Sequence, residues 1–155
     1  MQYDLEKILP HSKPMILIDK LLEVDMEEKS VLAELTISED KIFFDKSING
    51  TSHLCAIEYM AQTAGCYAYF KRNGLNTNIE EDKPKIGFLL GTRSLKCNID
   101  KFENGKTYQI KVNEIYGDNE LVSFKCLIYN NEEECASAII NAFQPENAEQ
   151  FLKEG

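Results

Sequence analysis

The sequence is poor in metal ligands, since its 155 residues include only two histidines and no Cys-x-x-Cys pair. Structural zinc sites use four cysteine or histidine ligands at short spacings, so the composition argues against a zinc centre. The cysteine count is five, an odd number, which favours reduced thiols over a disulfide framework. We therefore expect no metal and no other cofactor, and free thiols at Cys55, Cys66, Cys97, Cys126 and Cys135.

Basic residues are also in deficit, with 17 lysines and arginines against 26 aspartates and glutamates and a net charge of −9. An acidic chain of this kind repels nucleic acid, so we expect no nucleic-acid partner. The one basic stretch runs from residue 83 to residue 111, where seven basic residues meet two acidic ones. Such a strip is either a solvated surface or a surface that attracts an acidic partner at short range.

Long uncharged hydrophobic runs are missing as well. The least charged stretch, residues 52–70, still contains His53, Glu58, Gln62 and Thr63, and this polar content disfavours a membrane span. The N-terminus has no basic start followed by an apolar run, so no secretion signal is expected. These absences predict a cytoplasmic protein without a membrane partner.

The chain shows no repeats, low-complexity stretches or linkers, so we expect a single domain over 1–155 that ends in a polar tail over 144–155. Hydrophobic spacing predicts a short helix, two strands, one long helix and then four strands. The expected ranges are 3–9, 15–24, 30–37, 52–72, 85–97, 106–115, 121–129 and 135–143. Turn residues between the strands favour antiparallel pairing, and a sheet that curls around the long helix would bury it. The sheet would keep two edges, and edge pairing across a two-fold axis is a common route to a dimer.

The segment 52–72 carries the strongest helix pattern in the sequence. Thr51 or Ser52 can cap its first turn through a hydroxyl oxygen, and Asn73-Gly74 supplies a stop signal at the other end. Apolar residues surround the segment on most sides, which is typical of a buried helix. We therefore expect this helix to form the centre of the core.

Glu58 is the only charged residue in the first five turns of this helix. Its helical neighbours at three and four residues are three apolar or small residues and one amide, namely Leu54, Cys55, Ala61 and Gln62. Burial disfavours an ionised carboxylate, and a carboxyl that stays partly protonated at neutral pH can act as a general acid. The alternatives are a glutamate on the helix surface or one paired with a lysine or arginine from elsewhere.

The two histidines are candidate bases because imidazole titrates near neutral pH. His11 lies in Leu9-Pro10-His11-Ser12-Lys13-Pro14, a stiff segment, where it serves either as a base or as a partner of backbone groups. His53 lies in the first turn of the long helix, where it either caps the helix or contacts a substrate beside the free N–H groups. His53 is also the only base close in sequence to Cys55 and Cys66, so a cysteine nucleophile is a further alternative.

Several segments together resemble the bacterial 3-hydroxyacyl-ACP dehydratases. Leu9-Pro10-His11-Ser12-Lys13-Pro14-Met15-Ile16-Leu17-Ile18-Asp19 is similar to their L-P-H-R-x-P opening, and Ile57-Glu58-Tyr59-Met60-Ala61-Gln62 is similar to their E-A-x-A-Q helix motif. Phe88-Leu89-Leu90-Gly91 and the stretch that follows it resemble their glycine-bearing strand and its turn. Together with Ala142-Phe143-Gln144-Pro145, these segments are most similar to the dehydratase subgroup associated with aryl polyene clusters.

This resemblance implies a hot-dog fold of the α+β class, in which a curved antiparallel sheet wraps around one long buried helix. It implies a homodimer, with a heterodimer as the alternative, and active sites at the subunit interface. The implied reaction removes water from a 3-hydroxyacyl chain on acyl carrier protein to give a trans-2-enoyl thioester, in fatty-acid-like or aryl polyene biosynthesis. Glu58 matches the catalytic acid of these enzymes, and Gln62, His53 and Gly91 are candidate substrate-binding residues.

The chain departs from the family at the position of the usual base. The dehydratases carry a histidine in an H-F-P-G segment upstream of the acid, where this sequence reads Phe43-Phe44-Asp45-Lys46. We therefore assign the base to His11, which matches a histidine lining the same tunnel in the family, and keep His53 as the second candidate. Two other interpretations stay open: a non-catalytic or acyl-binding subunit that completes a heteromeric dehydratase, and a hot-dog thioesterase.

Overall fold

The computed structural model of the chain describes residues 3–9, 15–74, 88–118 and 121–143. Its strands are β1 (Lys20–Asp25), β2 (Ser30–Thr36), β3 (Gly50–Ser52), β4 (Phe88–Cys97), β5 (Lys101–Glu103), β6 (Thr107–Gly117), β7 (Leu121–Asn130) and β8 (Glu133–Phe143). Its helices are α1 (Leu5–Ile8), the short 3₁₀ turn η1 (His53–Cys55) and α2 (Ala56–Asn73). The predicted polar tail, 144–155, lies outside the described residues.

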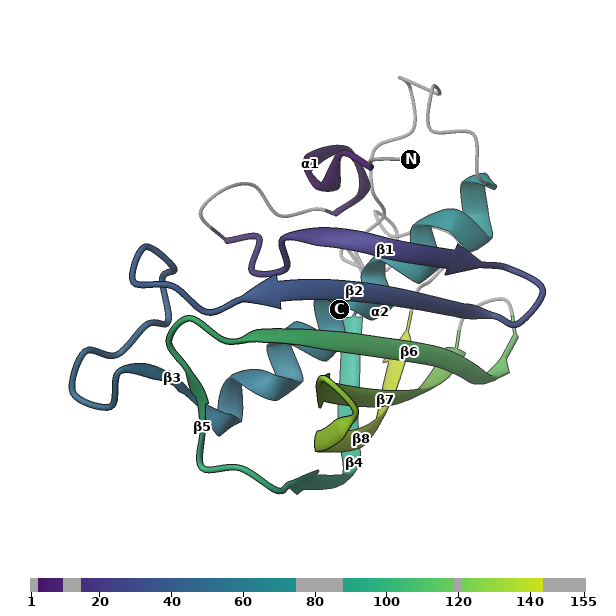
Figure 1. The fold of residues 1–155 in the computed structure, drawn as a ribbon. Coiled ribbons are helices and arrows are strands. Elements are labelled where there is room, and N and C mark those ends of the chain that lie inside the picture. Colours follow the sequence, from purple (N-terminus) through teal and green to yellow (C-terminus); the bar gives the residue numbers. More distant parts are fainter. Residues whose placement is uncertain (1–2, 10–14, 75–87, 119–120, 144–155) are drawn as a thin grey trace, which may run out of the picture.

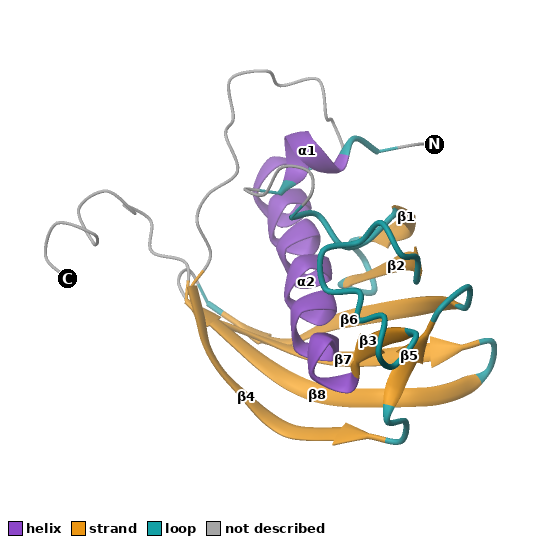
Figure 2. Cartoon of the chain, turned by 90° about the vertical axis from the view of Figure 1, so that its left-hand side faces the viewer, coloured by secondary structure: helices purple, strands orange, loops and turns teal. Residues whose placement is uncertain are grey.

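One antiparallel sheet dominates the described part of the chain. Its strand order is β1-β2-β6-β7-β8-β4, so β1 and β4 form its two edges, while β3 and β5 pair separately. The sheet curves around α2, which crosses its concave face (Figures 1 and 2). This arrangement confirms the predicted α+β architecture of a curved antiparallel sheet around one long helix.

The core lies between α2 and the concave face of the sheet. Alternate residues of each central strand point toward the helix and are buried, such as Tyr108, Ile110 and Val112 of β6. The helix contributes large buried side chains to the same layer, and Tyr67 of α2 meets Phe124 of β7 edge-to-face at 5.6 Å between ring centroids. Such aromatic pairs stabilise beyond their buried area.

The long helix begins and ends close to its predicted limits. Its start is preceded by η1, for which the Ser52 hydroxyl accepts a hydrogen bond from Leu54 N at 3.2 Å, as the capping prediction requires. At the other end Gly74 adopts a φ of 71°, and its N–H donates to Phe70 O at 2.8 Å. Glycine takes this left-handed conformation without the strain that a side chain would add, so the stop signal is confirmed.

Two parts of the strand prediction were wrong. The first strand was expected over 15–24, but β1 starts only at Lys20, because the main chain of residues 15–17 bonds to a side chain of α2. The strands β3 and β5 were not predicted, since three residues each are too few to show a period. Both changes affect the N-terminal end of α2, where β3 leads directly into η1.

None of the helices in the described part of the chain combines the length and apolar character of a membrane span. All five cysteines are free, as expected.

Candidate active site

Glu58 lies in the first turn of α2, on a stripe of the helix that the sheet does not cover. Its side chain is partly buried in the single chain, rather than enclosed as the sequence suggested. Neighbours on the same stripe are apolar yet also accessible: Leu54 is 63% exposed, and Ile57 and Ala61 are partly exposed. The carboxyl therefore sits beside an apolar surface that this chain leaves open.

Gln62 follows Glu58 by one helical turn and is almost fully buried. Its side-chain carbonyl accepts a hydrogen bond from Leu17 N at 2.8 Å, and its amide group donates to Met15 O at 2.8 Å. Both polar ends of the side chain are thus occupied by main chain of residues 15–19, which we call the strap. Gln62 fixes the strap against the helix next to Glu58, and a direct substrate contact by Gln62 stays a prediction.

A lysine that the sequence analysis missed also holds the strap. Lys41 donates to Leu17 O at 3.1 Å and forms an ion pair with Asp19 at 2.8 Å. The second carboxylate oxygen of Asp19 accepts from Thr36 N at 2.6 Å. Since Lys41 lies 24 and 22 residues from these two partners, no local pattern could have indicated the contact.

Replacing Gln62 by methionine is expected to destabilise the protein while keeping the side-chain volume. The buried Leu17 N–H would lose its acceptor, which costs about 1–3 kcal/mol. For a chain of this size, we expect the melting temperature to fall by about 3–10 °C. Thermal unfolding followed by circular dichroism measures the loss, and hydrogen exchange should show faster exchange at Leu17.

The matched control is Gln109→Met on β6, because Gln109 is partly exposed and lies on the convex face of the sheet. An unchanged melting temperature in Gln62→Met, or an equal loss in the control, would show that the strap does not depend on Gln62.

His53 occupies η1, just before α2, and its ring is oriented by main chain. The distance from its Nδ1 to the carbonyl oxygen of Asp100 is 3.1 Å. Since a carbonyl oxygen only accepts, Nδ1 is the donor in this contact, and in the tautomer with the proton on Nδ1 the other nitrogen, Nε2, has a free electron pair. The imidazole can therefore act as a base at the same end of α2 as Glu58.

Two further predicted site residues are His11 and Gly91. His11 lies outside the described residues. Gly91 lies on β4 and pairs with Asn141 of β8. A substrate contact by Gly91 stays a prediction.

The cysteines near the site are poorly suited to nucleophilic attack. Burial raises the pKa of the Cys55 thiol, and the charge of Glu58 raises it further. Burial also raises the pKa of Cys66, which is fully enclosed. Because the thiolate is the reactive form, the cysteine alternative loses support.

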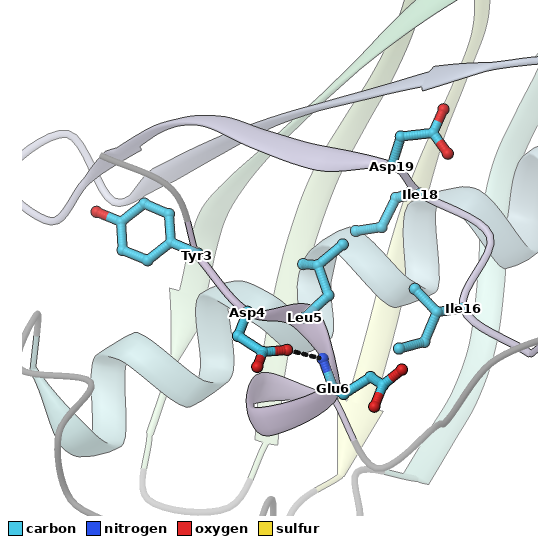
Figure 3. A pocket seen from close by; sticks show the side chains of 7 residues that line it. All are labelled: Tyr3, Asp4, Leu5, Glu6, Ile16, Ile18 and Asp19. Carbon is cyan, nitrogen blue, oxygen red and sulfur yellow. Dashed lines mark hydrogen bonds between the residues drawn. The ribbon is translucent and has the colours of Figure 1, made fainter.

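A pocket of about 520 Å³ lies between α1 and the strap (Figure 3). Its lining combines apolar side chains with three carboxylates, and consists of Tyr3, Asp4, Leu5, Glu6, Ile16, Ile18 and Asp19. None of Glu58, Gln62 and His53 is among these described lining residues. The acidic pocket is therefore separate from the candidate active site.

Comparison with known proteins adds family information to this geometry. The family model described as "ApeP-like: ApeP dehydratase" matches residues 3–153. The 3-hydroxyacyl-[acyl-carrier-protein] dehydratase FabZ of Acetivibrio thermocellus is 36% identical over 97 residues, and FabZ of Chlamydia trachomatis is 30% identical over 96 residues. Each match covers 60% of this chain, and the chain spans 60% and 59% of the length of these two relatives.

Solved structures show the same architecture. The dehydratase heterocomplex ApeI:P from Xenorhabdus doucetiae contains a chain that is 25% identical, with a TM-score of 0.83 and 97% coverage of both chains. A hypothetical thioesterase from Streptococcus pneumoniae, solved with coenzyme A, is 11% identical with a TM-score of 0.58, covering 81% of this chain and 84% of that one. The second likeness shows the fold alone, and together the matches confirm the predicted hot-dog fold.

Proposed function

Because this chain belongs to the ApeP-like dehydratase family, we propose that it removes water from 3-hydroxyacyl thioesters on acyl carrier protein. The product is a trans-2-enoyl thioester, made in fatty-acid-like or aryl polyene biosynthesis. The observation that carries this proposal is the position of Glu58, the residue that matches the family's acid. It lies at the start of the central helix, beside an open apolar surface and next to the strap that Gln62 holds.

The proposed reaction uses one base and one acid. An imidazole takes a proton from C2 of the acyl chain, and the electron pair left behind forms the C2–C3 double bond. The carboxyl of Glu58 gives a proton to the C3 hydroxyl, which leaves as water. General acids and bases of this kind each contribute about 10²–10⁴ to a rate. His11 is the proposed base, and the free Nε2 of His53 makes it the second candidate.

The accessible stripe around Glu58 supports a site completed by a second subunit. Leu54, Ile57 and Ala61 form an apolar border around the carboxyl, and apolar borders of this kind are typical of protein contacts. A subunit seated there would exclude water from the surface around Glu58. We propose a dimer with this stripe at its interface, and a homodimer is the simplest form.

A second candidate function is supported by the likeness to the ApeI:P heterocomplex. In this version the chain supplies the carboxyl of Glu58, and a different hot-dog subunit supplies the histidine. The replacement of the H-F-P-G histidine by the sequence Phe43-Phe44-Asp45-Lys46 favours such a division of labour. The subunit would then be inactive alone and active only in the mixed complex.

The reaction itself is tested by incubating the protein with a 3-hydroxyacyl-carrier protein and measuring the masses of the products by mass spectrometry. We expect a product lighter by one water molecule and still attached to the carrier. Release of the free hydroxy acid would instead indicate a thioesterase and contradict the dehydratase proposal. The 3-hydroxyacyl-carrier protein incubated without the enzyme, under the same conditions, controls for spontaneous loss of water.

A further inference from the structure

The convex face of the sheet, opposite α2, gathers four cations from three strands. Arg93 and Lys96 come from β4, Lys111 from β6 and Lys125 from β7. The register joins them in two rows, because Lys125 pairs with Ile139, which pairs with Arg93. In the second row the pairs run from Lys111 through Leu127 and Ser137 to Lys96. Paired residues point to the same side of a sheet, so all four charges share one face.

The neighbouring buried residues fix which face this is. Phe124, Cys126 and Ile128 of β7 point into the core, so the residues between them, Lys125 and Leu127, point outward. All four cations are exposed, and the described part of the chain contains no ion pair to any of them. We call this surface the convex basic patch: Arg93, Lys96, Lys111 and Lys125 around the partly buried Leu127 and Ile139.

The patch is small, and acids border it along one side. From the strand spacing, Lys125 and Arg93 lie roughly 10 Å apart and Lys111 and Lys96 roughly 14 Å apart, with the two rows separated by roughly 7 Å. The neighbouring row of paired residues runs across the sheet from Glu34 through Gln109 and Tyr129 to Glu134. It therefore has an acid at each end. Since charges are screened within about 8 Å at physiological salt, the patch attracts only a group that touches it.

These dimensions select a compact acidic partner. A membrane or a nucleic acid would extend over the flanking acids and meet a chain of net charge −9. A single helix with its side chains is about 10–12 Å wide and fits between the bordering acids. Leu127 and Ile139 offer apolar contact at the centre, which suits a helix that is acidic along its edges and apolar in the middle.

We propose that the convex basic patch is the docking surface for an acidic helix of the carrier protein, an inference that rests on the proposed function. The patch lies close to the candidate site, because Lys96 is followed by Cys97, whose thiol approaches His53 O on the concave side. Figure 2 shows the C-terminal end of β4 and the N-terminal end of α2 at the same end of the molecule. A thioester on a carrier docked there would reach the candidate site past residues 98–100, where the carbonyl oxygen of Asp100 bonds to His53.

The test compares Lys111→Glu/Lys125→Glu with Lys7→Glu, an exposed reversal on α1 far from the sheet's convex face. Binding of fluorescently labelled apo carrier protein to the full chain, with its partner subunit if one is needed, is measured by anisotropy. We expect about tenfold weaker binding for the double variant, with a reduced dependence on salt, and little change for Lys7→Glu. Lys111→Gln/Lys125→Gln removes the two positive charges without adding negative ones. Its affinity for the carrier should lie between those of the wild type and the charge-reversed double variant.

Carrier binding overturns the proposal if it is unchanged in a folded double variant or if Lys7→Glu weakens it equally. Binding of anionic vesicles through the same lysines, in place of the carrier, also overturns it. The proposed function is judged separately, with a 3-hydroxyacyl thioester of N-acetylcysteamine that needs no docking. The double variant should turn over this small substrate at the wild-type rate. No turnover of either substrate by the wild type, tested with its partner subunit if one is needed, would reject the function. Carrier binding would still be measured independently of turnover and would still test the patch.

Discussion

Replacing Glu58 by glutamine is expected to lower the rate of enoyl formation by about 10²–10⁴ without loss of the fold. Glutamine keeps the size and hydrogen-bonding reach of glutamate but cannot give a proton to the leaving C3 hydroxyl. The fold should persist because Glu58 is only partly buried, and no ion pair ties it to another described residue. The rate is measured as enoyl-carrier product formed per minute, with thermal unfolding as the check on folding.

The control for this substitution is Glu132→Gln, in the exposed turn between β7 and β8. It makes the same chemical change at a distance from the helix and should leave the rate unaltered. The base is tested in the same assay by His11→Ala, which should also abolish product. Full activity in Glu58→Gln would remove Glu58 from the reaction. Loss of activity in His53→Ala with full activity in His11→Ala would move the base to His53.

Mixing the chain with a hot-dog subunit that carries the H-F-P-G histidine is expected to produce the second large effect. If the site is divided between two different chains, turnover should rise by about 10²–10⁴ over that of the isolated chain, because the mixture supplies the missing base. The increase should saturate at equal amounts of the two chains. Product formation in a titration, together with the mass of the complex in solution, measures this.

Two variants make the titration specific. A partner in which the H-F-P-G histidine is replaced by alanine should still bind but restore no turnover. Glu58→Gln mixed with an unaltered partner should also stay inactive, because the carboxyl comes from this chain. Full turnover by the isolated chain would instead support the homodimer, and recovery of activity with Glu58→Gln would show that the partner is sufficient.

Features that depend on neighbours in the sequence were predictable. The central helix was recognised from its cap at Ser52, its apolar spacing and its stop at Gly74, all of which act within one or two turns. The singular position of Glu58 on that helix followed from the same local pattern. The absence of the H-F-P-G histidine follows from the residue identities alone, without any coordinates.

Other features of the site depend on contacts between distant residues. Gln62 meets the strap 45 residues earlier, and Lys41 meets it 24 residues earlier. The strap has a strand-like composition, but the main-chain groups of Met15 and Leu17 bond to side chains of Gln62 and Lys41, so these residues do not form a strand. The sequence also did not predict that Glu58 is accessible. Apolar residues around it on the helix give the same pattern whether the sheet of this chain or another subunit covers them.

The order of residues thus determined the central helix, its single carboxyl and the absence of the usual base, because these properties are set by the chemistry of adjacent groups. Only the tertiary structure decided which side of the helix stays open, what holds the strap beside Glu58, and that cations from β4, β6 and β7 share one face. Those arrangements depend on strand register and on packing between segments far apart in the chain, and neither has a local signature.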